Sequence, residues 1–417
     1  YYFNDHGEQI NRFAKSLVAA WAEANNLGEA GYQTETPCDG YKGAYINEIA
    51  ARVQAEAESD GVDLTALAHQ DQGLNDDGEP LGEADTEVRE EFRKRAVPMM
   101  FDEIQKSMKD FRVNFDVWFH ENSLYADGKV DAAIEELKSR GDIFDKDGAT
   151  WFESTKHGDD KDRVIIKSNG EFAYFAADIA YHRNKLEQRG FSKAINIWGA
   201  DHHGHVARLQ AALDGLGLDG SHRLIIVLMQ LVNLLQDGQP VRMSKRSGKA
   251  IALRDLLDEV SVDAARFFFN SRSSTSALDF DLDLAVREDS ENPVYYVQYA
   301  HARICSLIAR LAEEGHLVPD AAAVDPALYA TAEEKALIKT LSQLPEVIRL
   351  AARDYDPSGV NRYLVTLAGE FHRFYNACRI KGEEAAVLAA RLKLADTVRA
   401  VIANCLSLIG VAAPEKM

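Results

Sequence analysis

The spacing of hydrophobic positions is helical at both ends of this chain and mixed in the middle. Residues 7–26, 44–58 and about 87–111 carry apolar side chains at three- and four-residue intervals, which predicts amphipathic helices. The stretch 59–86 interrupts this spacing with glycine, aspartate and glutamate. Such a composition cannot bury much apolar surface, and it predicts an exposed acidic insertion.

Short apolar runs alternate with helical spacing in the middle of the chain. Residues 151–167 predict strands, and 168–170 predict the turn that follows them. Residues 173–189 predict a helix, and the runs 194–198 and 224–229 predict two buried strands with another helix between them. The order strand, helix, strand predicts a parallel α/β unit.

After about residue 290 the spacing is helical throughout. Three apolar stripes lie within 297–311, 364–378 and 392–409, with prolines near the breaks, which predicts a helical bundle. The four cysteines are far apart and include no CxxC pair, which argues against a zinc ribbon and a disulfide framework. Three of them lie on these stripes and are expected to be core thiols: Cys305, Cys378 and Cys405.

Length and charge refine this picture. The 417 residues predict two or three domains, and the net charge of -20 at first argues against nucleic-acid binding. However, the part from Arg242 onward holds 22 basic and 24 acidic residues, so it can carry a local basic face. No apolar run approaches the roughly 20 residues that cross a membrane, and the first residues lack the pattern of a secretory signal.

A basic loop rich in serine and glycine follows the predicted turn at Asp237-Gly238. It spans Val241 to Lys249 and includes Met243, Ser244, Lys245 and Ser247. Such a loop can fold over a polyphosphate, because a lysine ammonium stabilises developing negative charge and hydroxyls and amides donate hydrogen bonds. The alternative for the loop is a solvated turn.

A second candidate segment begins where the first buried strand ends. Gly199 lets a ligand approach the backbone, and Asp201 can accept hydrogen bonds from ribose hydroxyls or an amine. The helix N-terminus that follows favours anionic groups. Alternatively, Asp201 and the histidines at 202, 203 and 205 could bind a metal, as in the similar motif of DHH-family phosphoesterases. The sequence offers no second Asp/His cluster for a two-metal site.

Two further patterns could bind substrates. Tyr174 and Asp178 are four residues apart and share a helix face, where a carboxylate can pair with a guanidinium; the alternative is an ordinary surface helix. Aromatic and basic residues also lie along the bundle helices, where rings can stack on bases and arginines can contact phosphates; the alternative is solvated arginines. The members of this second pattern are Tyr296, Tyr299, Arg303, Arg373 and Arg379.

These motifs, taken together and in order, resemble arginyl-tRNA synthetases of the bacterial type, which are class I aminoacyl-tRNA synthetases. Tyr2–Gln9 resembles the Asn-Asp-x-Gly-x-Gln segment of that family, and Tyr41–Ile46 resembles its Tyr-x-Gly-x-Tyr-Ile segment. Residues 242–248 resemble its KMSKS loop, with Arg242 in place of lysine. Asp263–Arg266 resembles its DALR motif, with alanine for leucine.

The resemblance implies an α/β fold: a class I Rossmann-like parallel sheet, incomplete at its N-terminus, followed by an all-α DALR anticodon-binding bundle. The expected parts are a core at 1–240 with an acidic helical insertion at about 27–150, a loop and stem at 241–290, and the bundle at 291–417. It also implies ATP-dependent activation of arginine and transfer to the 3′ end of tRNA(Arg). Mg²⁺ would accompany ATP, without a structural metal, in a cytoplasmic monomer.

The resemblance also implies roles for individual residues. Four loop residues would be catalytic: Met243, Ser244, Lys245 and Ser247. ATP would be bound by Gly199, Asp201, His202, His205 and Lys245. Arginine would be bound by Gln9, Tyr174, Asp178 and His202. The aromatic and basic residues of the bundle would bind tRNA.

The sequence opens at a point where the family is already past its HIGH signature, so we expect that signature to be missing from the nucleotide pocket. We therefore expect a nucleotide pocket that is open on one side, and little or no activity from this chain alone. Two alternative functions are a non-catalytic tRNA-binding module and a metal-dependent DHH-type phosphoesterase.

Overall fold

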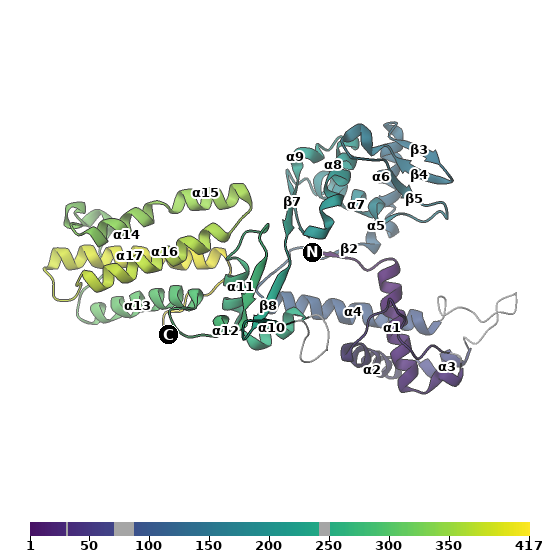
Figure 1. Cartoon of the computed structure of the whole chain (residues 1–417), viewed down its shortest axis with the longest axis horizontal. Coiled ribbons are helices and arrows are strands. Elements are labelled where there is room, and N and C mark those ends of the chain that lie inside the picture. Colours follow the sequence, from purple (N-terminus) through teal and green to yellow (C-terminus); the bar gives the residue numbers. More distant parts are fainter. Residues whose placement is uncertain (31, 71–86, 242–250) are drawn as a thin grey trace. The chain divides into compact units, whose positions relative to one another are not determined.

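A computed structural model describes residues 1–30, 32–70, 87–241 and 251–417. Its internal contacts define two compact units, one built from residues 1–227 together with Ile251 and the other from residues 228–241 and 252–417. Figure 1 labels the elements of each unit. Among the described residues, no helix combines the length and the apolar character that crossing a membrane requires.

One core of the first unit consists of helices whose apolar stripes face each other around Trp21 and Phe92. The three helices predicted from the spacing are confirmed. Within the predicted exposed stretch 59–86, the described residues form a further short helix, of which Leu64 and Ala68 are buried against the other helices. The elements are α1 (Glu8–Ala24), η1 (Leu27–Ala30), α2 (Ala44–Ser59), α3 (Leu64–Gln70) and α4 (Glu87–Asp110).

The second core of this unit combines strands and helices around Leu137, Phe152 and Leu213. Its elements begin with β1 (Tyr2–Phe3), β2 (Phe119–His120), α5 (Asn122–Ala126), α6 (Lys129–Ser139), β3 (Ile143–Lys146), β4 (Ala149–Phe152), η3 (Ser154–His157) and β5 (Arg163–Ile166). They continue with α7 (Tyr174–Arg183), η4 (Asn184–Gln188), β6 (Ala194–Gly199), η5 (Ala200–His205), α8 (Val206–Gly215), α9 (Gly220–Arg223) and β7 (Leu224–Met229).

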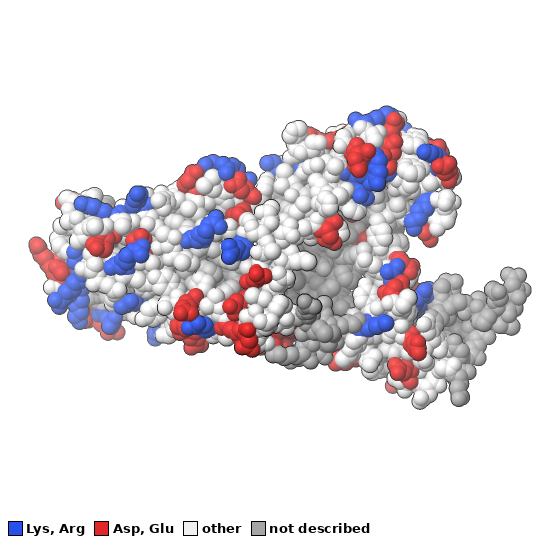
Figure 2. All heavy atoms as spheres, in the orientation of Figure 1, with Lys and Arg blue, Asp and Glu red and all other residues white. Residues whose placement is uncertain are grey.

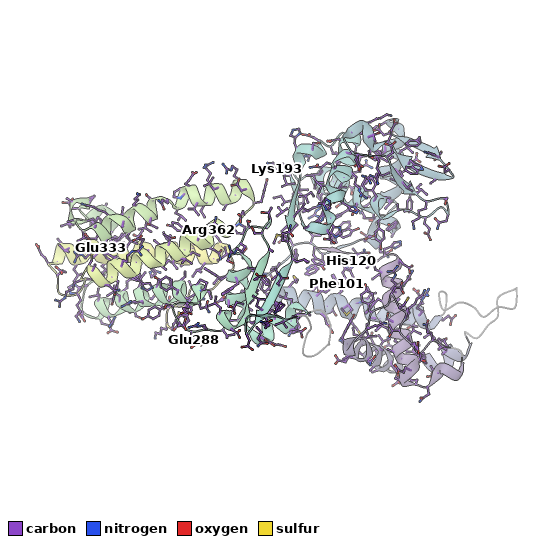
Figure 3. All side chains as sticks on the ribbon, viewed as in Figure 1. Phe101, His120, Lys193, Glu288, Glu333 and Arg362 are labelled. Carbon is purple, nitrogen blue, oxygen red and sulfur yellow. The ribbon has the colours of Figure 1, made fainter. Side chains whose placement is uncertain are left out.

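Three small sheets support this second core. β1 pairs in parallel with β2, β3 to β5 form an antiparallel sheet, and β6 lies beside β7. Helix α4 reaches the end of β2, where the rings of Phe101 and His120 face each other with centroids 4.8 Å apart (Figure 3). Residues 124–143, which lie inside the predicted insertion, contribute side chains to this core and not to the core around Trp21.

The strand β6 corrects one expectation about burial. The run 194–198 was predicted to be a buried strand, but Ile195 is 50% exposed and Ile197 is 70% exposed. Side chains alternate between the two faces of a strand, and only the face of Ala194 and Asn196 packs inward. Among the described residues β6 pairs with β7 alone, which leaves its other edge unpaired, and no element covers the face of Ile195 and Ile197 well enough to bury it.

The second unit joins a three-stranded sheet to a helical bundle. Its elements are β8 (Val232–Gln236), β9 (Gln239–Pro240), α10 (Leu253–Glu259), α11 (Val262–Phe269), β10 (Leu278–Asp281), α12 (Leu282–Ala285), α13 (Pro293–Glu313), η6 (Ala321–Ala323), η7 (Pro326–Leu328), α14 (Ala332–Ser342), α15 (Leu344–Asp354), α16 (Ser358–Ala377) and α17 (Ala385–Leu408). β8 pairs in parallel with β10 and antiparallel with β9.

Two predictions about this unit are confirmed. Asp237 and Gly238 join β8 to β9 with φ angles of 51° and 68°, the left-handed conformation that a two-residue type I′ hairpin requires. The three apolar stripes of the bundle are buried along α13, α16 and α17. All four cysteines are free thiols; Cys378 and Cys405 are buried, whereas Cys305 is half-buried.

Candidate active site

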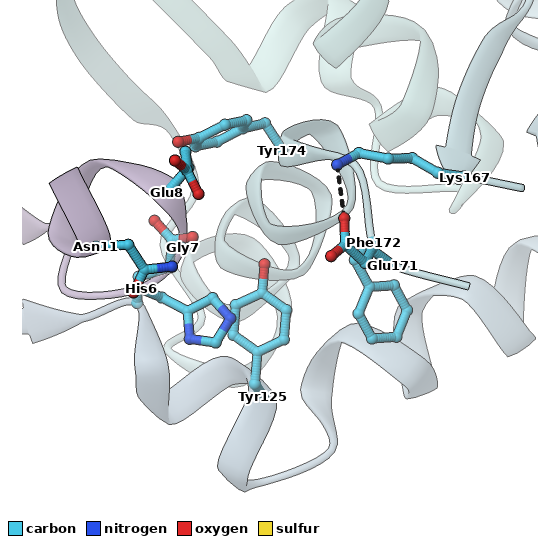
Figure 4. Close-up of a pocket in the computed structure, with 10 residues that line it drawn as sticks. His6, Gly7, Glu8, Asn11, Tyr125, Lys167, Glu171, Phe172 and Tyr174 are labelled. Carbon is cyan, nitrogen blue, oxygen red and sulfur yellow. Dashed lines mark hydrogen bonds and ion pairs between the residues drawn. The ribbon is translucent and has the colours of Figure 1, made fainter. Parts of the chain in front are cut away.

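A pocket of about 460 Å³ lies in the first unit, where the start of α1 faces α5 and the start of α7 (Figure 4). An ion pair between Lys167 and Glu171, 3.0 Å long, borders it on one side. The pocket is concave and mixes aromatic with charged side chains, as small-molecule sites do. It is lined by His6, Gly7, Glu8, Asn11, Glu121, Tyr125, Lys167, Glu171, Phe172 and Tyr174.

Two carboxyl groups at this site have raised pKa values. Asp178 follows Tyr174 by one turn of α7, and burial together with the negative charge of Glu121 raises its pKa to about 7. Lys185 and Arg208 act in the opposite direction. Burial also raises the pKa of Glu121, although a hydrogen bond from Tyr2 partly offsets this effect. Two buried acids that repel each other favour a cationic ligand.

Tyrosine hydroxyls surround these acids. Burial and the charges of Glu121 and Asp178 raise the pKa of Tyr125 to about 12, and the same causes raise the pKa of Tyr2 further. Both phenols therefore stay protonated at neutral pH and can donate hydrogen bonds. Tyr174 is 55% exposed at the pocket wall, where a ligand can cover its ring.

The structure agrees only in part with the arginine-site residues that the sequence suggested. It brings Tyr174 to the pocket and Asp178 within electrostatic range of Glu121. Neither Asp178 nor Gln9 is among the residues that line the pocket, and Gln9 is exposed. Glu121 and Tyr125 were missed. A signal for Glu121 exists, because it directly follows the short strand β2, just as the segment with Asp201 follows β6.

Gly199 ends β6, and the residues from Ala200 to His205 form a short 3₁₀ helix directly after it. A side-chain carbon at Gly199 would lie 2.5 Å from Oδ1 of Asp201, so the backbone comes close to that carboxylate. The Asp201 side chain is 82% exposed and lies 3.7 Å from Nε2 of His202. Burial and the charge of Arg208 lower the pKa of His205, which keeps its imidazole neutral at pH 7.

Two other predictions about chemistry concern metals and the basic loop. Within the described ranges, no three or more His, Cys, Asp or Glu side chains gather in a way that could hold a metal ion. The four predicted catalytic residues of the loop lie outside the described residues: Met243, Ser244, Lys245 and Ser247.

A cluster of rings and one arginine lies between two helices of the bundle. On α13, Tyr299 is 41% exposed, and its ring stacks on His372 of α16 with centroids 6.0 Å apart. The guanidinium of Arg303 lies 4.0 Å from the centroid of Tyr375. Tyr296 packs against His372 at 4.9 Å. We call these five residues the aromatic cluster.

The two remaining arginines of the predicted tRNA surface have other partners. Arg373 is exposed and pairs with Glu370, one turn earlier on α16. Arg379 follows the end of α16, and its Nε donates to the carbonyl of Lys381. Figure 2 shows basic and acidic side chains interspersed over the bundle in that view. Recognition of RNA there would thus depend on stacking as well as on charge.

Comparisons with known proteins identify the family. Residues 80–287 match a model of the "tRNA synthetases class I (R), catalytic domain", and residues 297–417 match the "DALR anticodon binding domain". An arginine–tRNA ligase of Bifidobacterium longum (strain NCC 2705) is 64% identical over 442 residues, which cover 100% of this chain and 71% of the relative. The chain belongs to the arginyl-tRNA synthetase family.

Solved structures agree with this family. A crystal structure from Campylobacter jejuni, assigned as an arginyl-tRNA synthetase, superposes with a TM-score of 0.82 at 33% identity, covering 100% of this chain and 84% of the other. The Thermus thermophilus arginyl-tRNA synthetase superposes with a TM-score of 0.72 at 19% identity, covering 100% and 75%. The second match shows the shared fold.

The family settles the reaction class. The synthetase is an arginine–tRNA ligase, with arginine, ATP and tRNA as substrates. The predicted fold class, a class I α/β catalytic part followed by a helical DALR domain, is confirmed. These matches favour neither a non-catalytic tRNA-binding module nor a DHH-type phosphoesterase.

Proposed function

We propose that the synthetase binds the arginine side chain between Asp178 and Glu121. The observation that supports this most directly is the pair of acids whose pKa values are raised by burial and, for Asp178, by the charge of Glu121. A planar guanidinium has five donors and can pair with two carboxylates at once. Tyr125 and Tyr174 would border its faces, and His202 would approach the other end of the amino acid.

ATP would lie beside the arginine, over the segment that follows β6. We propose that Gly199 and Asp201 hold the adenosine and that the neutral imidazole of His205 lies near the phosphates. Lys245 would stabilise charge on the α-phosphate from the loop, aided by Met243, Ser244 and Ser247. Mg²⁺ would arrive with ATP and neutralise its phosphates.

The chemistry would proceed in two steps. A carboxylate oxygen of arginine attacks the α-phosphorus of ATP, and pyrophosphate leaves with the electrons of the broken P–O bond. A ribose hydroxyl of the tRNA 3′ end then attacks the carbonyl carbon of arginyl-adenylate, loses its proton and displaces AMP. In both steps the protein mainly positions the reactants and stabilises charge.

The tRNA would contact the second unit. We propose that the aromatic cluster stacks on unpaired bases of tRNA(Arg), with Arg373 and Arg379 near phosphates. We further propose the functional division at 1–240, 241–290 and 291–417, and a cytoplasmic monomer. Sedimentation of the purified chain at several concentrations tests the monomer, since a dimer would double the mass.

Binding of arginine by the 417-residue chain tests the proposed pocket. We expect Asp178→Asn and Glu121→Gln each to weaken arginine binding at least tenfold in calorimetry. Asp127→Asn is the control, because Asp127 is exposed and pairs with Lys129. Citrulline, which is nearly isosteric but uncharged, should bind far more weakly than arginine. Equal affinity of the wild type and both pocket variants would refute the site.

Exchange of pyrophosphate into ATP tests the rest of the mechanism. We expect exchange that requires arginine and is stimulated by tRNA(Arg), and a loss of about 100-fold or more in Lys245→Ala. Exchange that persists without arginine would contradict the proposed activation step. If tRNA(Arg) binds but no pyrophosphate exchange occurs in its presence, the alternative of a non-catalytic tRNA-binding module would be favoured.

A further inference from the structure

Three polar side chains behind Asp178 form a continuous chain of hydrogen bonds. Lys185 Nζ lies 2.7 Å from Oδ1 of Asn196, and Nδ2 of Asn196 lies 2.6 Å from Nε2 of His182. Nδ1 of His182 lies 2.7 Å from the main-chain oxygen of Asp178. The chain therefore connects strand β6 to helix α7 at the turn that carries Asp178.

The chemistry of its two ends sets the direction of every bond. An ammonium can only donate, so Asn196 accepts through Oδ1 and must donate through Nδ2. His182 then accepts at Nε2 and carries its proton on Nδ1, which donates to the carbonyl of Asp178. Only the neutral imidazole fits, and His182 is 2% exposed, where a charge would be costly. Burial and the charge of Lys185 lower its pKa to about 3.

The surroundings of Lys185 favour this arrangement. The α-helix changes to a π-helical turn over Asn184–Gln188, immediately after α7. A π turn offsets the following side chains, and such turns often occur at functional sites. Here it places the Lys185 ammonium 4.5 Å from the ring centroid of Tyr181 as well as against Asn196. Arg189 and Asp178 are the other charged groups that act on Lys185.

Asn196 also stands close to the nucleotide segment in the sequence. It precedes Gly199 by three residues on the same strand, and its side chain points to the inner face, opposite to Ile195 and Ile197. One side chain thus contacts the helix of the proposed arginine site and belongs to the strand that leads into the proposed ATP site.

We propose that three positioning residues, Asn196, His182 and Lys185, hold the carboxylate of Asp178 in register with the ATP-binding segment. Asp178 is the group proposed to pair with the arginine guanidinium. This proposal rests on the assignment of Asp178 to arginine. Its consequence is energetic coupling: arginine and ATP each bind more tightly when the other is present, because each fixes one end of the same bridge. Breaking the bridge leaves both subsites in place and removes the coupling.

The protonation of His182 tests the bridge without any ligand. In the wild type, NMR of the imidazole nitrogens should show a neutral Nδ1–H tautomer with no titration between pH 5 and 8. Asn196→Asp replaces the donor at Nε2 by an acceptor, so His182 should bind a second proton and titrate at or above pH 6.5. The signal is assigned by its loss in His182→Gln. A wild-type His182 that titrates near pH 6.5 would overturn the proposal.

Substrate binding tests the positioning role. We expect a non-hydrolysable ATP analogue to lower the arginine Kd several-fold in the wild type and to have no effect in Asn196→Asp or Lys185→Met. Lys185→Met keeps an unbranched stem against Tyr181, which guards against a folding defect, and circular dichroism verifies the fold. Asn169→Asp, in an exposed turn, introduces the same charge change as a control and should keep the coupling.

The possible outcomes separate this proposal from the proposed arginine site. If Asp178→Asn abolishes arginine binding but both bridge variants keep full coupling, the bridge is refuted and the site stands. If Asp178→Asn binds arginine as the wild type does, the site is refuted and the bridge loses its stated role. Loss of coupling in both bridge variants, with the fold intact, supports the proposal.

Discussion

The carboxylate of Asp263 accepts a hydrogen bond from the main-chain nitrogen of Ala412, 149 residues later, at 3.0 Å. Nε2 of Gln298 lies 2.9 Å from the other oxygen of Asp263 and 2.9 Å from the Ala412 carbonyl. Arg266 donates from Nε to the carbonyl of Ile409 at 2.9 Å. The Asp and Arg of the DALR-like motif therefore fasten the last residues of the chain to α11 and α13.

We expect Asp263→Ala to destabilise the second unit by about 1–3 kcal/mol, because it leaves donors of Gln298 and Ala412 unpaired. Thermal unfolding followed by circular dichroism would show a lower Tm, and proteolysis would cleave the C-terminal segment faster. The control is Asp354→Ala, which removes only an exposed ion pair with Arg353 and should leave the Tm unchanged. Equal protease resistance of Asp263→Ala and the wild type would disprove the fastening role.

Arginine affinity should depend on pH through Asp178. Its pKa is about 7 without ligand, and the guanidinium pairs with the ionised form, so the arginine Kd should fall as the pH rises from 6 to 8. The decrease approaches tenfold per pH unit below 7 and levels off above it. Calorimetry in buffers of different ionisation enthalpy should detect proton release at pH 6.5. The arginine Kd of Asp178→Asn should not change with pH in this range. A wild-type Kd that is also independent of pH would contradict this linkage.

The raised pKa of Asp178 also makes the stability of the ligand-free protein depend on pH. The folded-state pKa of Asp178 lies above the unfolded value of 3.8, so its contribution to stability is fully present below pH 4. The contribution is lost as the pH rises through 7. The change in Tm that Asp178→Asn causes in the ligand-free chain should therefore be more favourable at pH 8 than at pH 5. An identical effect of the substitution at both pH values would argue against a raised pKa.

Binding of tRNA should weaken when the aromatic cluster is altered. Loss of base stacking costs about 1–3 kcal/mol per base, so Tyr299→Ala should lower the affinity by roughly ten- to a hundredfold. Arg373→Ala should reduce the slope of log K against log salt by about one, because the proposal places Arg373 near a phosphate. Filter binding at several salt concentrations measures both effects. Arg349→Ala, on the exposed face of α15, is the matched control.

ATP binding should respond to a single methyl group at Gly199. In Gly199→Ala the new carbon would lie 2.5 Å from Oδ1 of Asp201, so this exposed side chain must rotate away. We expect ATP to bind several-fold more weakly at an unchanged Tm, because the displaced group is flexible. Gly204→Ala provides the comparison, since an added carbon there meets no atom within 4 Å. Equal ATP affinity of both variants would remove Asp201 from the proposed site.

Residue patterns along the chain were sufficient to predict the main elements and the family. Helices such as α13 and α16 follow from apolar spacing, because a stripe at helical intervals is stable only when one face is buried. The turn at Asp237-Gly238 follows from residues that adopt positive φ at low cost. Tyr174 and Asp178 share a helix face for the same geometric reason, and the ordered motifs identified the arginyl-tRNA synthetase family.

The pairing of groups from different elements could not be predicted in this way, because it depends on how the elements pack. The charge of Glu121 acts on Asp178, 57 residues later, and Asn196 lies beside His182, because separate strands and helices pack into one core; no local pattern encodes that pairing. The open face of β6 was also unpredictable, since hydrophobicity predicts burial but not whether a neighbouring element covers the strand. Burial and neighbouring charges set pKa values, and both arise only after the chain has folded.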